Sequence, residues 1–471
     1  MTKLKDKLEQ RKATAAVIGL GYVGLPLALE ILKAGFNVIG IDTDRKKIRS
    51  LEMGQSYIVD VKSEEILNAL LGGRFYPTDD FEMLRKVDTI SICVPTPLSK
   101  SKDPDISFIL AATEEVRKNL RPGQLVVLES TTYPGTTEEI ILPELEATGL
   151  KVGKDFFLAF SPERIDPGNR VFSLRNTPKV VGGLTPQCGA MARAFYSQFI
   201  DKVVQVSSPK CAEMVKLLEN TFRSVNIGMV NEMAQMCDLL GVDLYEVIDA
   251  AATKPFGFIP FYPGPGLGGH CIPIDPHYLA WKLKALNFHA RFIALASEIN
   301  GMMPSVVSRL VTEGLNRSAK SVRGAKILVL GVAYKKGVND CRESPAIDVI
   351  RILREKGARI SYNDPYVPRL DIETKSLNSV ELTPATIQEQ DCLVILTDHD
   401  SFHLKDILKW AKLVIDTRNS TKGLEEFQHK IIKLGAGSKE TNVLDDEDVD
   451  KEALPSVTTH ETTRGSSEHL V

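Results

Sequence analysis

Residues 263–275 of the chain, PGPGLGGHCIPID, hold a cysteine in a setting that could support chemistry. Cys271 follows a run of glycines and prolines and lies four residues before Asp275. A cysteine acts as a nucleophile when its thiolate is stabilised and accessible. Glycines can bring backbone N–H groups close to an anion, and Asp275 could act as an acid or base or orient one. The same spacing also fits a tight structural loop around a buried cysteine, so both interpretations stay open.

A second candidate site is the glycine motif GLGYVG at residues 19–24, which matches GxGxxG. It lies between an apolar run and a helical pattern, and a second apolar run ends at Asp42, eighteen positions after Gly24. In a dinucleotide site, Gly19 permits the tight turn, Gly21 lets the backbone approach a pyrophosphate, and Gly24 lets the helix pack on the strand. This context predicts a dinucleotide site rather than a glycine turn without a ligand.

Asp42 indicates which dinucleotide binds. A carboxylate at the end of the second strand accepts hydrogen bonds from ribose hydroxyls and repels a 2′-phosphate, which favours NAD over NADP. The basic residues Arg45, Lys46 and Lys47 follow closely and weaken this preference. We predict NAD as the cofactor, and we include Lys47 in its site together with Tyr22 and Val23 of the glycine turn.

The elements that must position these residues alternate between strands and helices. Residues 14–42 are typical of a strand, a helix and a strand, and the apolar runs at 88–95 and 124–131 extend this pattern. A second alternating region begins at residue 324. Between the two regions, residues 211–240 have the apolar spacing of one long amphipathic helix that ends at Gly241. Its role as a dimerisation element or as an ordinary core helix stays open.

We therefore predict an α/β protein with two Rossmann-like, doubly wound parallel-sheet domains joined by a long central helix. The predicted segments are an N-terminal extension (1–12), an NAD-binding domain (13–208), a central helical region (209–318), a second Rossmann-like domain (319–436) and an acidic tail (437–471). The central region contains residues 263–275 around Cys271, which we call the cysteine loop. The tail has nine acidic and three basic residues from position 438 onward. Because it cannot bury enough apolar surface to offset the entropy of ordering, we predict that it is disordered.

Length, charge and cysteine content narrow the class of protein. The 471 residues exceed the ~250–300 at which single hydrophobic cores stop growing. A net charge of −3 provides no basic field for nucleic acid, and no run of ~18 apolar residues could span a membrane. The charged N-terminus lacks the apolar core of a signal peptide, and the seven cysteines form no CxxC pair. We predict a cytoplasmic multi-domain protein without nucleic-acid or membrane partners.

Only one cluster of potential metal ligands stands out in the sequence. His399 and His403 have Asp398 and Asp400 beside them. They follow the apolar run at 392–397 instead of sharing one face of a predicted helix, so we predict no metal site.

Several motifs follow one another between residues 13 and 435. They are GLGYVGLPLA, VPTPL, ESTTYPGT, SPERIDPG, AEMVKLLENTFRSVNIGMVNE, PGPGLGGHCIPIDP and GVAYKKGVNDCRESPA. Together they closely resemble the UDP-glucose/GDP-mannose dehydrogenase family, and within it most of all the bacterial UDP-N-acetylglucosamine 6-dehydrogenases.

This resemblance implies a four-electron oxidation. In that family one enzyme takes the C6 alcohol of a nucleotide sugar through an aldehyde to an acid, with two successive hydride transfers. An aldehyde carbon has no carbinol hydrogen to give as a second hydride until a nucleophile adds to it. By resemblance, Cys271 attacks the aldehyde to form a thiohemiacetal, a second NAD oxidises this to a thioester, and water releases the carboxylate.

The resemblance also implies roles for other residues. Lys216 and Asn220 lie four apart on the predicted long helix, and by spacing alone they would belong to a solvated polar face. They resemble the pair that stabilises oxyanion charge and holds a water. Thr131 and Glu163 resemble residues that organise this water and assist proton transfer, and Asp275 resembles the acid beside the cysteine.

Ligand contacts are implied in the same way. Thr96, Thr131 and Arg342 resemble cofactor contacts. The implied substrate contacts are Glu163, Arg164, Lys216, Asn220, Tyr262, Gly268 and Lys335. The family likeness further implies that residues 319–436 bind the UDP part of a UDP-sugar, that the sugar nucleotide lies in the cleft between the two domains, and that the protein is a homodimer through the central helix.

Three features depart from the UDP-glucose type. Ile274 replaces a lysine, Glu163-Arg164-Ile165-Asp166-Pro167-Gly168 replaces a common Glu-Phe-Leu sequence, and His270 precedes the cysteine. These features resemble the N-acetylhexosamine branch and disfavour glucose, and the likeness to UDP-N-acetylglucosamine 6-dehydrogenases predicts UDP-GlcNAc as the substrate. UDP-ManNAc is an alternative substrate, because GlcNAc and ManNAc differ only in the orientation of a single group. UDP-glucose, which lacks the N-acetyl group, is a second alternative.

Two other functions are compatible with parts of the sequence. A two-electron dehydrogenase of the 3-hydroxyacid type also joins a dinucleotide domain to a long helix with a lysine, but it needs neither Cys271 nor a second Rossmann-like domain. A non-catalytic NAD(H)-responsive binding protein would keep the fold without the chemistry. The presence of all six implied catalytic residues argues against it.

Overall fold

The computed structural model describes residues 2–58, 61–99, 103–166, 169, 171–269, 271–373 and 375–437. The predicted acidic tail from residue 438 onward lies outside them, as do Pro167, Gly168 and His270. Within these ranges, no helix has both the length and the apolar character needed to cross a membrane.

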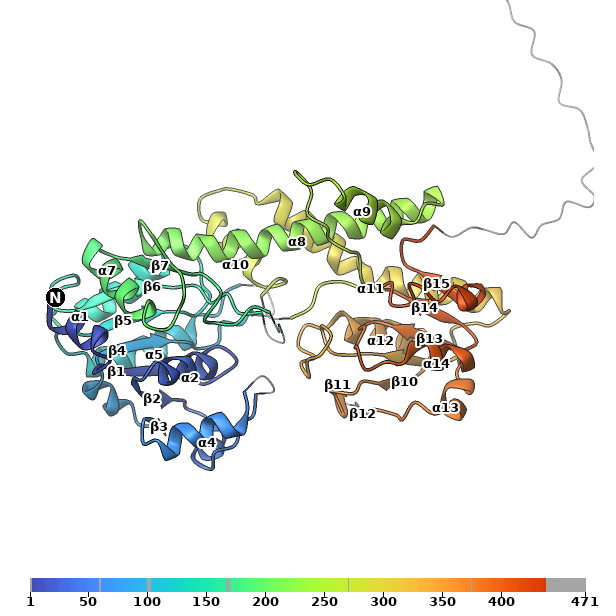
Figure 1. Ribbon diagram of the computed structural model, residues 1–471. Coiled ribbons are helices and arrows are strands. Elements are labelled where there is room, and N and C mark those ends of the chain that lie inside the picture. The colour runs from blue at the N-terminus through green and yellow to red at the C-terminus, as the bar shows by residue number, and fades with distance from the viewer. Residues whose placement is uncertain are drawn as a thin grey trace, which may run out of the picture. The chain divides into compact units, whose positions relative to one another are not determined.

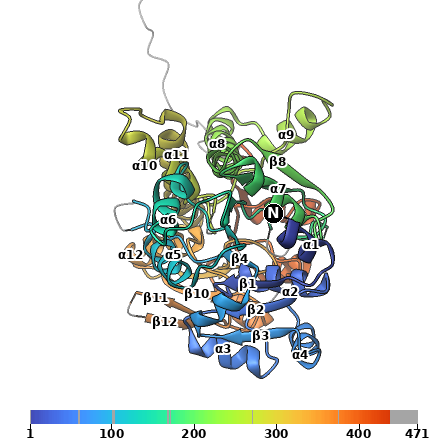
Figure 2. The ribbon, with the colours of Figure 1, turned by 90° about the vertical axis from the view of Figure 1, so that its left-hand side faces the viewer.

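The first sheet consists of eight strands. They are β1 (Thr14–Ile18), β2 (Asn37–Ile41), β3 (Phe75–Thr78), β4 (Thr89–Ile92), β5 (Leu125–Leu128), β6 (Phe157–Phe160), β7 (Lys179–Gly183) and β8 (Val203–Val206). Their order is β3-β2-β1-β4-β5-β6-β7-β8; Figure 1 labels β1 to β7 and Figure 2 labels β8. Within this sheet, β6 and β7 are paired antiparallel. The chain order reverses between β1 and β4, which is the switch point where doubly wound sheets bind ligands.

The register of the central strands brings three chain segments to one edge of the sheet. Ile18 at the end of β1 lies opposite Ile41 of β2 and Ile92 of β4. Gly19, Asp42 and Cys93 follow these residues directly, so the chain leaves all three strands at the same edge. The sheet therefore places the glycine turn beside Asp42, as the dinucleotide motif requires.

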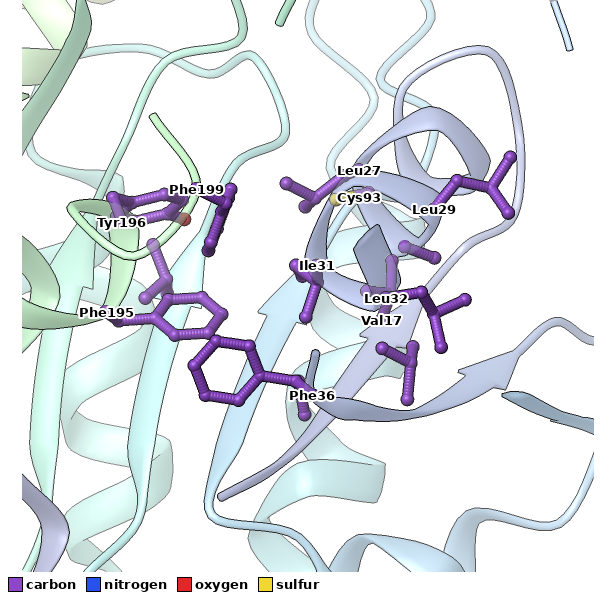
Figure 3. Close-up of a cluster of buried hydrophobic side chains, with 14 of the residues drawn as sticks. Val17, Leu27, Leu29, Ile31, Leu32, Phe36, Cys93, Phe195, Tyr196 and Phe199 are labelled. Atoms are coloured by element: carbon purple, nitrogen blue, oxygen red, sulfur yellow. The ribbon is translucent and has the colours of Figure 1, made fainter. Parts of the chain in front are cut away.

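Helices and shorter turns connect the strands of this sheet. They are α2 (Gly24–Lys33), α3 (Arg45–Glu52), α4 (Ser63–Leu71), η1 (Phe81–Lys86), α5 (Ser107–Asn119), η2 (Thr137–Ile141), α6 (Leu142–Glu146) and α7 (Pro186–Tyr196). Alternate strand residues belong to two separate apolar clusters: Val17 packs in one, and Ala16 and Ile18 pack in the other. Figure 3 shows the first cluster, in which Phe36 packs edge-on against Phe195. Both faces of the sheet are therefore buried, as a doubly wound fold requires.

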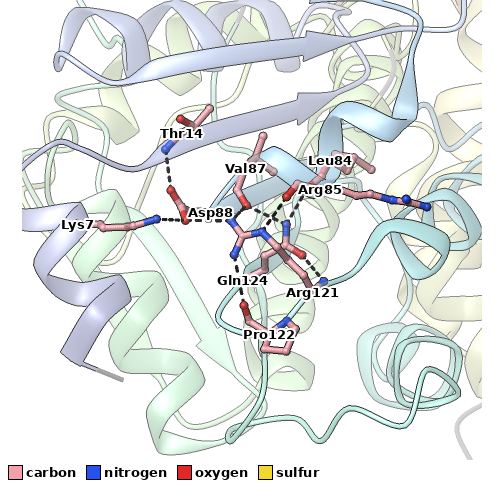
Figure 4. Close-up of polar contacts among 9 residues, drawn as sticks. All are labelled: Lys7, Thr14, Leu84, Arg85, Val87, Asp88, Arg121, Pro122 and Gln124. Atoms are coloured by element: carbon pink, nitrogen blue, oxygen red, sulfur yellow. Dashed lines mark hydrogen bonds and ion pairs between the residues drawn. The ribbon is translucent and has the colours of Figure 1, made fainter.

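The N-terminal segment forms helix α1 (Thr2–Glu9) and packs against α7. Its Leu4 and Leu8 are buried in the first cluster. Lys7 Nζ lies 2.7 Å from a carboxylate oxygen of Asp88, which also accepts a hydrogen bond from Arg121 (Figure 4). The segment predicted as an extension thus carries its own apolar and ionic contacts to the first sheet.

Between the two sheets, the described part of the chain forms a helical region. Its helices are α8 (Pro209–Leu240), α9 (Leu244–Ala252), α10 (Asp275–Lys284) and α11 (Arg291–Arg317). Ser208, directly before α8, caps this helix by accepting the backbone N–H of Cys211 on its hydroxyl, and Gly241, directly after the helix, has a φ of 69°. This confirms the predicted long central helix. Helix α11, which packs along α8 and was not predicted, is almost as long.

The second sheet has five parallel strands in the order β10-β9-β13-β14-β15. They are β9 (Lys326–Leu330), β10 (Arg359–Asn363), β13 (Cys392–Ile395), β14 (Val414–Asp416) and β15 (Ile431–Lys433), with a separate hairpin of β11 (Arg369–Ile372) and β12 (Lys375–Asn378). Its helices are α12 (Pro345–Glu355), α13 (Pro384–Gln388), α14 (Leu404–Trp410) and η3 (Glu425–Lys430). The predicted fold class, with two Rossmann-like sheets and a long central helix, is confirmed.

Candidate active site

A cavity of 980 Å³ adjoins the switch point of the first sheet. Segments that follow β1, β4, β5 and β6 contribute to its wall, together with α8, the cysteine loop, α11 and the segment around the start of α12. The predicted site residues on this wall are Gly21, Tyr22, Val23, Lys47, Thr96, Thr131, Glu163, Lys216, Cys271, Asp275 and Arg342. The volume suits a ligand of cofactor size.

The glycine turn fits a dinucleotide. Gly19 has a φ of +89°, which favours glycine, and a Cβ on Gly24 would lie 1.8 Å from the carbonyl oxygen of Gly19. A Cβ on Gly21 would meet nothing within 4 Å, although Gly21 lies on the cavity wall. Gly19 and Gly24 therefore serve the fold, whereas the missing side chain of Gly21 leaves room beside the N-terminus of α2 for a phosphate.

Asp42 is held by three donors. One carboxylate oxygen accepts the backbone N–H of Leu20 at 2.9 Å and Lys47 Nζ at 3.0 Å, and the other accepts the N–H of Asp44 at 2.9 Å. Arg45 instead pairs with Asp79 at 2.9 Å. The carboxylate is thus fixed beside the glycine turn, where an NAD ribose would bind.

Arg342 reaches the glycine turn from the segment before α12. Its guanidinium lies 5.3 Å from the centre of the Tyr22 ring and is held 2.8 Å from Asp340. Thr96 also lies on the cavity wall, and its backbone carbonyl accepts a hydrogen bond from Tyr278 at 3.0 Å. The structure therefore brings both predicted cofactor contacts to the cavity that Gly21 lines.

Cys271 ends the glycine-rich loop and is exposed to the cavity. Its backbone carbonyl accepts the N–H of Asp275 at 2.8 Å, which links the cysteine to the first residue of α10. The surrounding protein raises the pKa of the thiol; Lys216 lowers it, Asp275 and Glu163 raise it, and the net shift is upward. The resting thiol is therefore protonated at neutral pH and needs a base before it can attack.

Lys216 is buried in α8, and its Nζ donates to the backbone carbonyl of Glu163 at 2.9 Å. Burial lowers the pKa of this lysine, but the nearby Cys271, Asp275 and Glu163 raise it, and the net shift is upward. Lys216 is therefore a fixed positive charge beside the cysteine, able to stabilise a thiolate or an oxyanion.

Asn220 lies one turn after Lys216 in α8, and its side-chain amide donates to Asp275 at 2.6 Å. Asp275 is itself buried. Asn220 is not on the cavity wall, so the structure connects it to the site through Asp275. The two polar residues of α8 thus lie on the side of the helix that faces the cysteine loop, whereas their spacing alone indicated a solvated polar face.

Glu163 follows β6 and is buried at the cavity wall. One carboxylate oxygen accepts the backbone N–H groups of Arg164 at 2.7 Å and Ile165 at 2.6 Å. Burial raises the pKa of this carboxyl, but Lys179, Lys216 and the two N–H groups lower it, and the net shift is downward. Glu163 is therefore a carboxylate at neutral pH.

Several predicted ligand contacts do not line the cavity: Gly19, Gly24, Asp42, Arg164, Asn220, Tyr262, Gly268 and Lys335. Arg164 pairs with Glu219 at 2.6 Å, and Tyr262 donates to Asp249 at 2.9 Å. Lys335 Nζ lies 2.5 Å from Asp166. These arginine and lysine side chains already have protein partners, so an anionic ligand would have to compete with a carboxylate for each of them.

Three buried polar residues near the site were not predicted. Glu129 follows β5 and lies on the cavity wall, Lys179 begins β7, and Tyr196 ends α7. Glu129 bonds both of the others, at 2.7 Å to Lys179 and 2.6 Å to Tyr196. A charged residue directly after the apolar run LVVL was the available signal for Glu129.

His399, one of the histidines considered above as a metal ligand, forms hydrogen bonds within the second domain. His399 is buried and bonds Asp364 at 3.0 Å, and its other ring nitrogen accepts the backbone N–H of Gly337 at 3.1 Å. Asp364 also accepts N–H groups from the turn after β9. Across the part of the chain that the structure describes, no group of three or more His, Cys, Asp or Glu side chains is placed to hold a metal ion.

Comparison with protein families gives three consecutive matches. They are the NAD binding domain (residues 13–200), the central domain (210–302) and the UDP binding domain (328–423) of the UDP-glucose/GDP-mannose dehydrogenase family.

Individual relatives cover most of the chain. A UDP-N-acetyl-D-mannosamine dehydrogenase from Pyrococcus horikoshii is 36% identical over 86% of this chain and 96% of its own. A UDP-N-acetyl-D-glucosamine 6-dehydrogenase from Pseudomonas aeruginosa is 36% identical over 82% of this chain and 90% of its own. The solved structure of a UDP-D-ManNAc dehydrogenase from Pyrococcus horikoshii superimposes with a TM-score of 0.82, with 35% identity over 90% of this chain and 99% of that chain.

Proposed function

Because the chain belongs to the UDP-glucose/GDP-mannose dehydrogenase family, it is an NAD-dependent nucleotide-sugar dehydrogenase, and we propose that it oxidises the C6 alcohol of UDP-GlcNAc to the uronic acid. We assign NAD binding to residues 13–208 and UDP binding to residues 319–436. The observation that carries the proposal is that Cys271 opens into the same cavity as Gly21 of the cofactor turn, with Lys216 and Asp275 beside it.

The cofactor site would be formed by Gly21, Asp42, Thr96 and Arg342. NAD, when bound there, accepts one hydride in each of the two oxidations. The chain itself must then manage protons and one covalent bond. In the first oxidation Glu163, as a carboxylate, receives the proton of the C6 hydroxyl directly or through a water that Thr131 orients. The ammonium of Lys216 stabilises the negative charge that develops on this oxygen.

The second oxidation depends on Cys271. Its S–H proton passes to a neighbouring carboxylate, for which Asp275 is the candidate, and the sulfur forms a bond to the aldehyde carbon. The aldehyde oxygen becomes an oxyanion beside Lys216, and the tetrahedral carbon now carries the hydrogen that leaves as the second hydride. Water then adds to the resulting thioester, the C–S bond breaks, and the cysteine recovers a proton as the uronate is released.

The choice of sugar rests on the N-acetylhexosamine character of the sequence. The two relatives above act, by their names, on UDP-N-acetyl-D-mannosamine and on UDP-N-acetyl-D-glucosamine, at similar identity to this chain. Residues 163–166 and Ile274 favour an N-acetylhexosamine over glucose, and the overall likeness of the sequence motifs to UDP-N-acetylglucosamine 6-dehydrogenases is our reason for choosing the glucosamine type. UDP-ManNAc is the second candidate substrate, with the same residues and the same chemistry.

The proposed activity is tested by measuring how many NADH form per sugar nucleotide consumed. Purified protein with excess NAD and a limiting amount of UDP-GlcNAc should form about two NADH per sugar consumed, because both oxidations occur on one enzyme. UDP-ManNAc and UDP-glucose are run in parallel. Two NADH only with another sugar would transfer the substrate assignment and keep the mechanism. One NADH per sugar would contradict the role of Cys271, and no NADH with any sugar would contradict the proposed activity.

The quaternary structure is a further part of the proposal. Helix α8 carries a row of exposed apolar side chains: Met214, Leu218, Phe222, Met229, Met233, Met236, Leu239 and Leu240. A contiguous apolar surface of this kind commonly marks a protein interface. We propose that this α8 surface forms a homodimer.

A further inference from the structure

A chain of buried polar contacts leads from α7 to the cavity wall. The Tyr196 hydroxyl donates to Glu129 at 2.6 Å, and Lys179 Nζ lies 2.7 Å from Glu129 and 3.3 Å from Glu163. The side chains of Lys179 and Glu129 are 4% and 0% exposed, so water does not screen their interaction. Lys179 thus bridges one carboxylate behind the site and one at the site.

Each partner comes from a different element of the first sheet. Glu129 follows β5, Glu163 follows β6, and Lys179 is the first residue of β7. The bridge therefore depends on the pairing of three adjacent strands. It reaches Glu163 from the side opposite the backbone N–H groups of Arg164 and Ile165, because it contacts the other carboxylate oxygen.

The charges around Glu163 are nearly balanced. Lys179 and Lys216 provide two cations, and Glu129 and Glu163 provide two anions. Cys93 is also buried next to this group; burial and the nearby Glu129 raise the pKa of its thiol, so it stays neutral. Cys271 and Asp275 face Lys216 from the cysteine loop.

The pKa of Lys179 is consistent with a persistent cation. Burial lowers this pKa, whereas Glu129 and Glu163 raise it, and the net shift is upward. For Glu163, burial raises the pKa of the carboxyl, but Lys179 is the strongest of the groups that lower it. A buried carboxylate that lost this partner would bind a proton more readily, because burial disfavours the charged form.

We propose that Lys179, anchored by Glu129 and Tyr196, is a positioning residue that keeps Glu163 ionised and oriented toward the cavity. The inference rests on the proposed function, in which Glu163 accepts a proton. Lys179 would touch neither substrate nor cofactor, since it does not line the cavity. It would act through Glu163 and set the lower end of the pH range in which the enzyme works.

The test uses variants that separate charge balance from the effect on Glu163. Lys179→Met leaves two carboxylates without their cation and carries a risk of misfolding. Lys179→Met/Glu129→Gln removes one charge of each sign, so buried charge stays balanced while Glu163 still loses its partner. Lys210→Met is the matched control, because it removes a lysine that is paired with Glu138 at 3.6 Å on the exposed surface.

The expected result is a displaced acid limb in the pH profile of kcat. In Lys179→Met/Glu129→Gln this limb should move upward by about 1–3 pH units, since an opposite charge within contact distance shifts a pKa by that amount. KM for the sugar nucleotide should change much less than kcat. Lys210→Met should keep the wild-type profile. An unchanged acid limb in the double variant, with wild-type activity present, would overturn the inference.

A second measurement does not depend on turnover. In infrared spectra recorded over a pH series, the band of a protonated carboxyl should appear at a pH about 1–3 units higher in the double variant than in wild type, and adding Glu163→Gln should remove this early band. If wild type forms no NADH with any sugar, the proposed function fails, but the band still decides whether Lys179 keeps Glu163 ionised. Absence of this early band would overturn the inference whatever the activity.

Discussion

In the proposed reaction, Cys271 must be a thiol at rest and a thiolate at the moment of attack. Its surroundings serve both needs, because desolvation by the protein around the cavity raises the thiol pKa while Lys216 stabilises the anion once it forms. A weakly acidic thiol also resists unwanted oxidation, since the thiolate is the reactive form. These needs explain why Cys271, Lys216, Glu163 and Asp275 lie together on the cavity wall.

The first prediction concerns the covalent step. Cys271→Ala should yield no more than about one NADH per sugar and no uronic acid, because the aldehyde would have no nucleophile to form the thiohemiacetal. NADH absorbance and product mass measure both quantities. Cys211→Ala is the control, because Cys211 is also exposed and lies outside the cavity wall. Two NADH per sugar from Cys271→Ala would favour a dehydrogenase that does not use the thiol.

The second prediction concerns the pH dependence of the thiol. In a Cys211→Ser background, alkylation of Cys271 by iodoacetamide should accelerate with rising pH, with a midpoint above the ordinary range of a cysteine. Lys216→Met should move the midpoint further upward, because it removes the cation that lowers this pKa. Glu163→Gln should move it downward, because it removes an anion that raises it. Shifts in the opposite directions would contradict the arrangement of charges described here.

Two glycines of the turn have different roles: Gly24 is needed for folding, and Gly21 for binding the cofactor. A Cβ on Gly24 would lie 1.8 Å from the Gly19 carbonyl oxygen, whereas one on Gly21 would meet no atom within 4 Å. Gly24→Ala should therefore lower the free energy of unfolding by about 1–3 kcal/mol or more, as overpacking does.

Gly21→Ala should instead fold normally and bind NAD more weakly, with KM for NAD raised about tenfold, the equivalent of ~1.4 kcal/mol. Thermal unfolding and initial rates compare the pair. A stable Gly24→Ala variant, or a Gly21→Ala variant with unchanged KM, would show that the turn is not organised in this way.

The cysteine loop is held by buried amides of α8 and α11. Asn231 accepts the N–H of Gly264 at 2.9 Å and donates to Asn300 at 2.9 Å, and Asn300 donates to the carbonyl of Ser224 at 3.1 Å. Asn231→Leu should cost about 1–3 kcal/mol of stability, since it leaves buried polar groups unpaired. It should also lower kcat/KM, because the loop leads to Cys271.

Urea unfolding and steady-state kinetics measure these two effects. Gln235→Leu, one turn further along α8 and partly exposed, is the control and should change both quantities less. Equal effects of the two variants would mean that the loop does not depend on the amide at position 231.

The sequence could predict contacts within one βαβ unit but not contacts between residues on distant strands. The turn, Asp42 and the strand–helix–strand unit around them follow from a local pattern, because each contact joins residues close together in the sequence. Lys179 could not be predicted in this way. Its partners Glu129 and Glu163 lie 50 and 16 residues away, and they meet only through the pairing of β5, β6 and β7.

Helix α8 was predicted correctly from its apolar spacing, but the side of the helix that is buried was not. Leu217 is fully buried and Leu218 is 61% exposed, while Lys216 and Asn231 are buried although they are polar. Apolar periodicity predicts burial on one face only when one face packs against the chain itself. Here polar residues occupy the inner side because the active site and the cysteine loop lie there.

The exposed apolar row on α8 predicts that the protein self-associates. Met229 is 49% and Met233 37% exposed on α8, and both belong to the proposed interface. Met229→Glu/Met233→Glu should convert a dimer to a monomer, because two carboxylates would be buried without partners in each copy. The far-ultraviolet circular dichroism should not change, since neither side chain packs in the core of one subunit.

Light scattering coupled to gel filtration measures the mass, and Leu71→Glu on α4 is the control because Leu71 is also exposed and lies outside the row. That variant should keep the wild-type mass. A monomeric wild-type protein, or a dimer that withstands both glutamates, would mean that α8 is not the interface. Because α8 also carries Lys216, the activity of the monomeric variant then tells whether association supports the site: retained kcat would show that each subunit is complete.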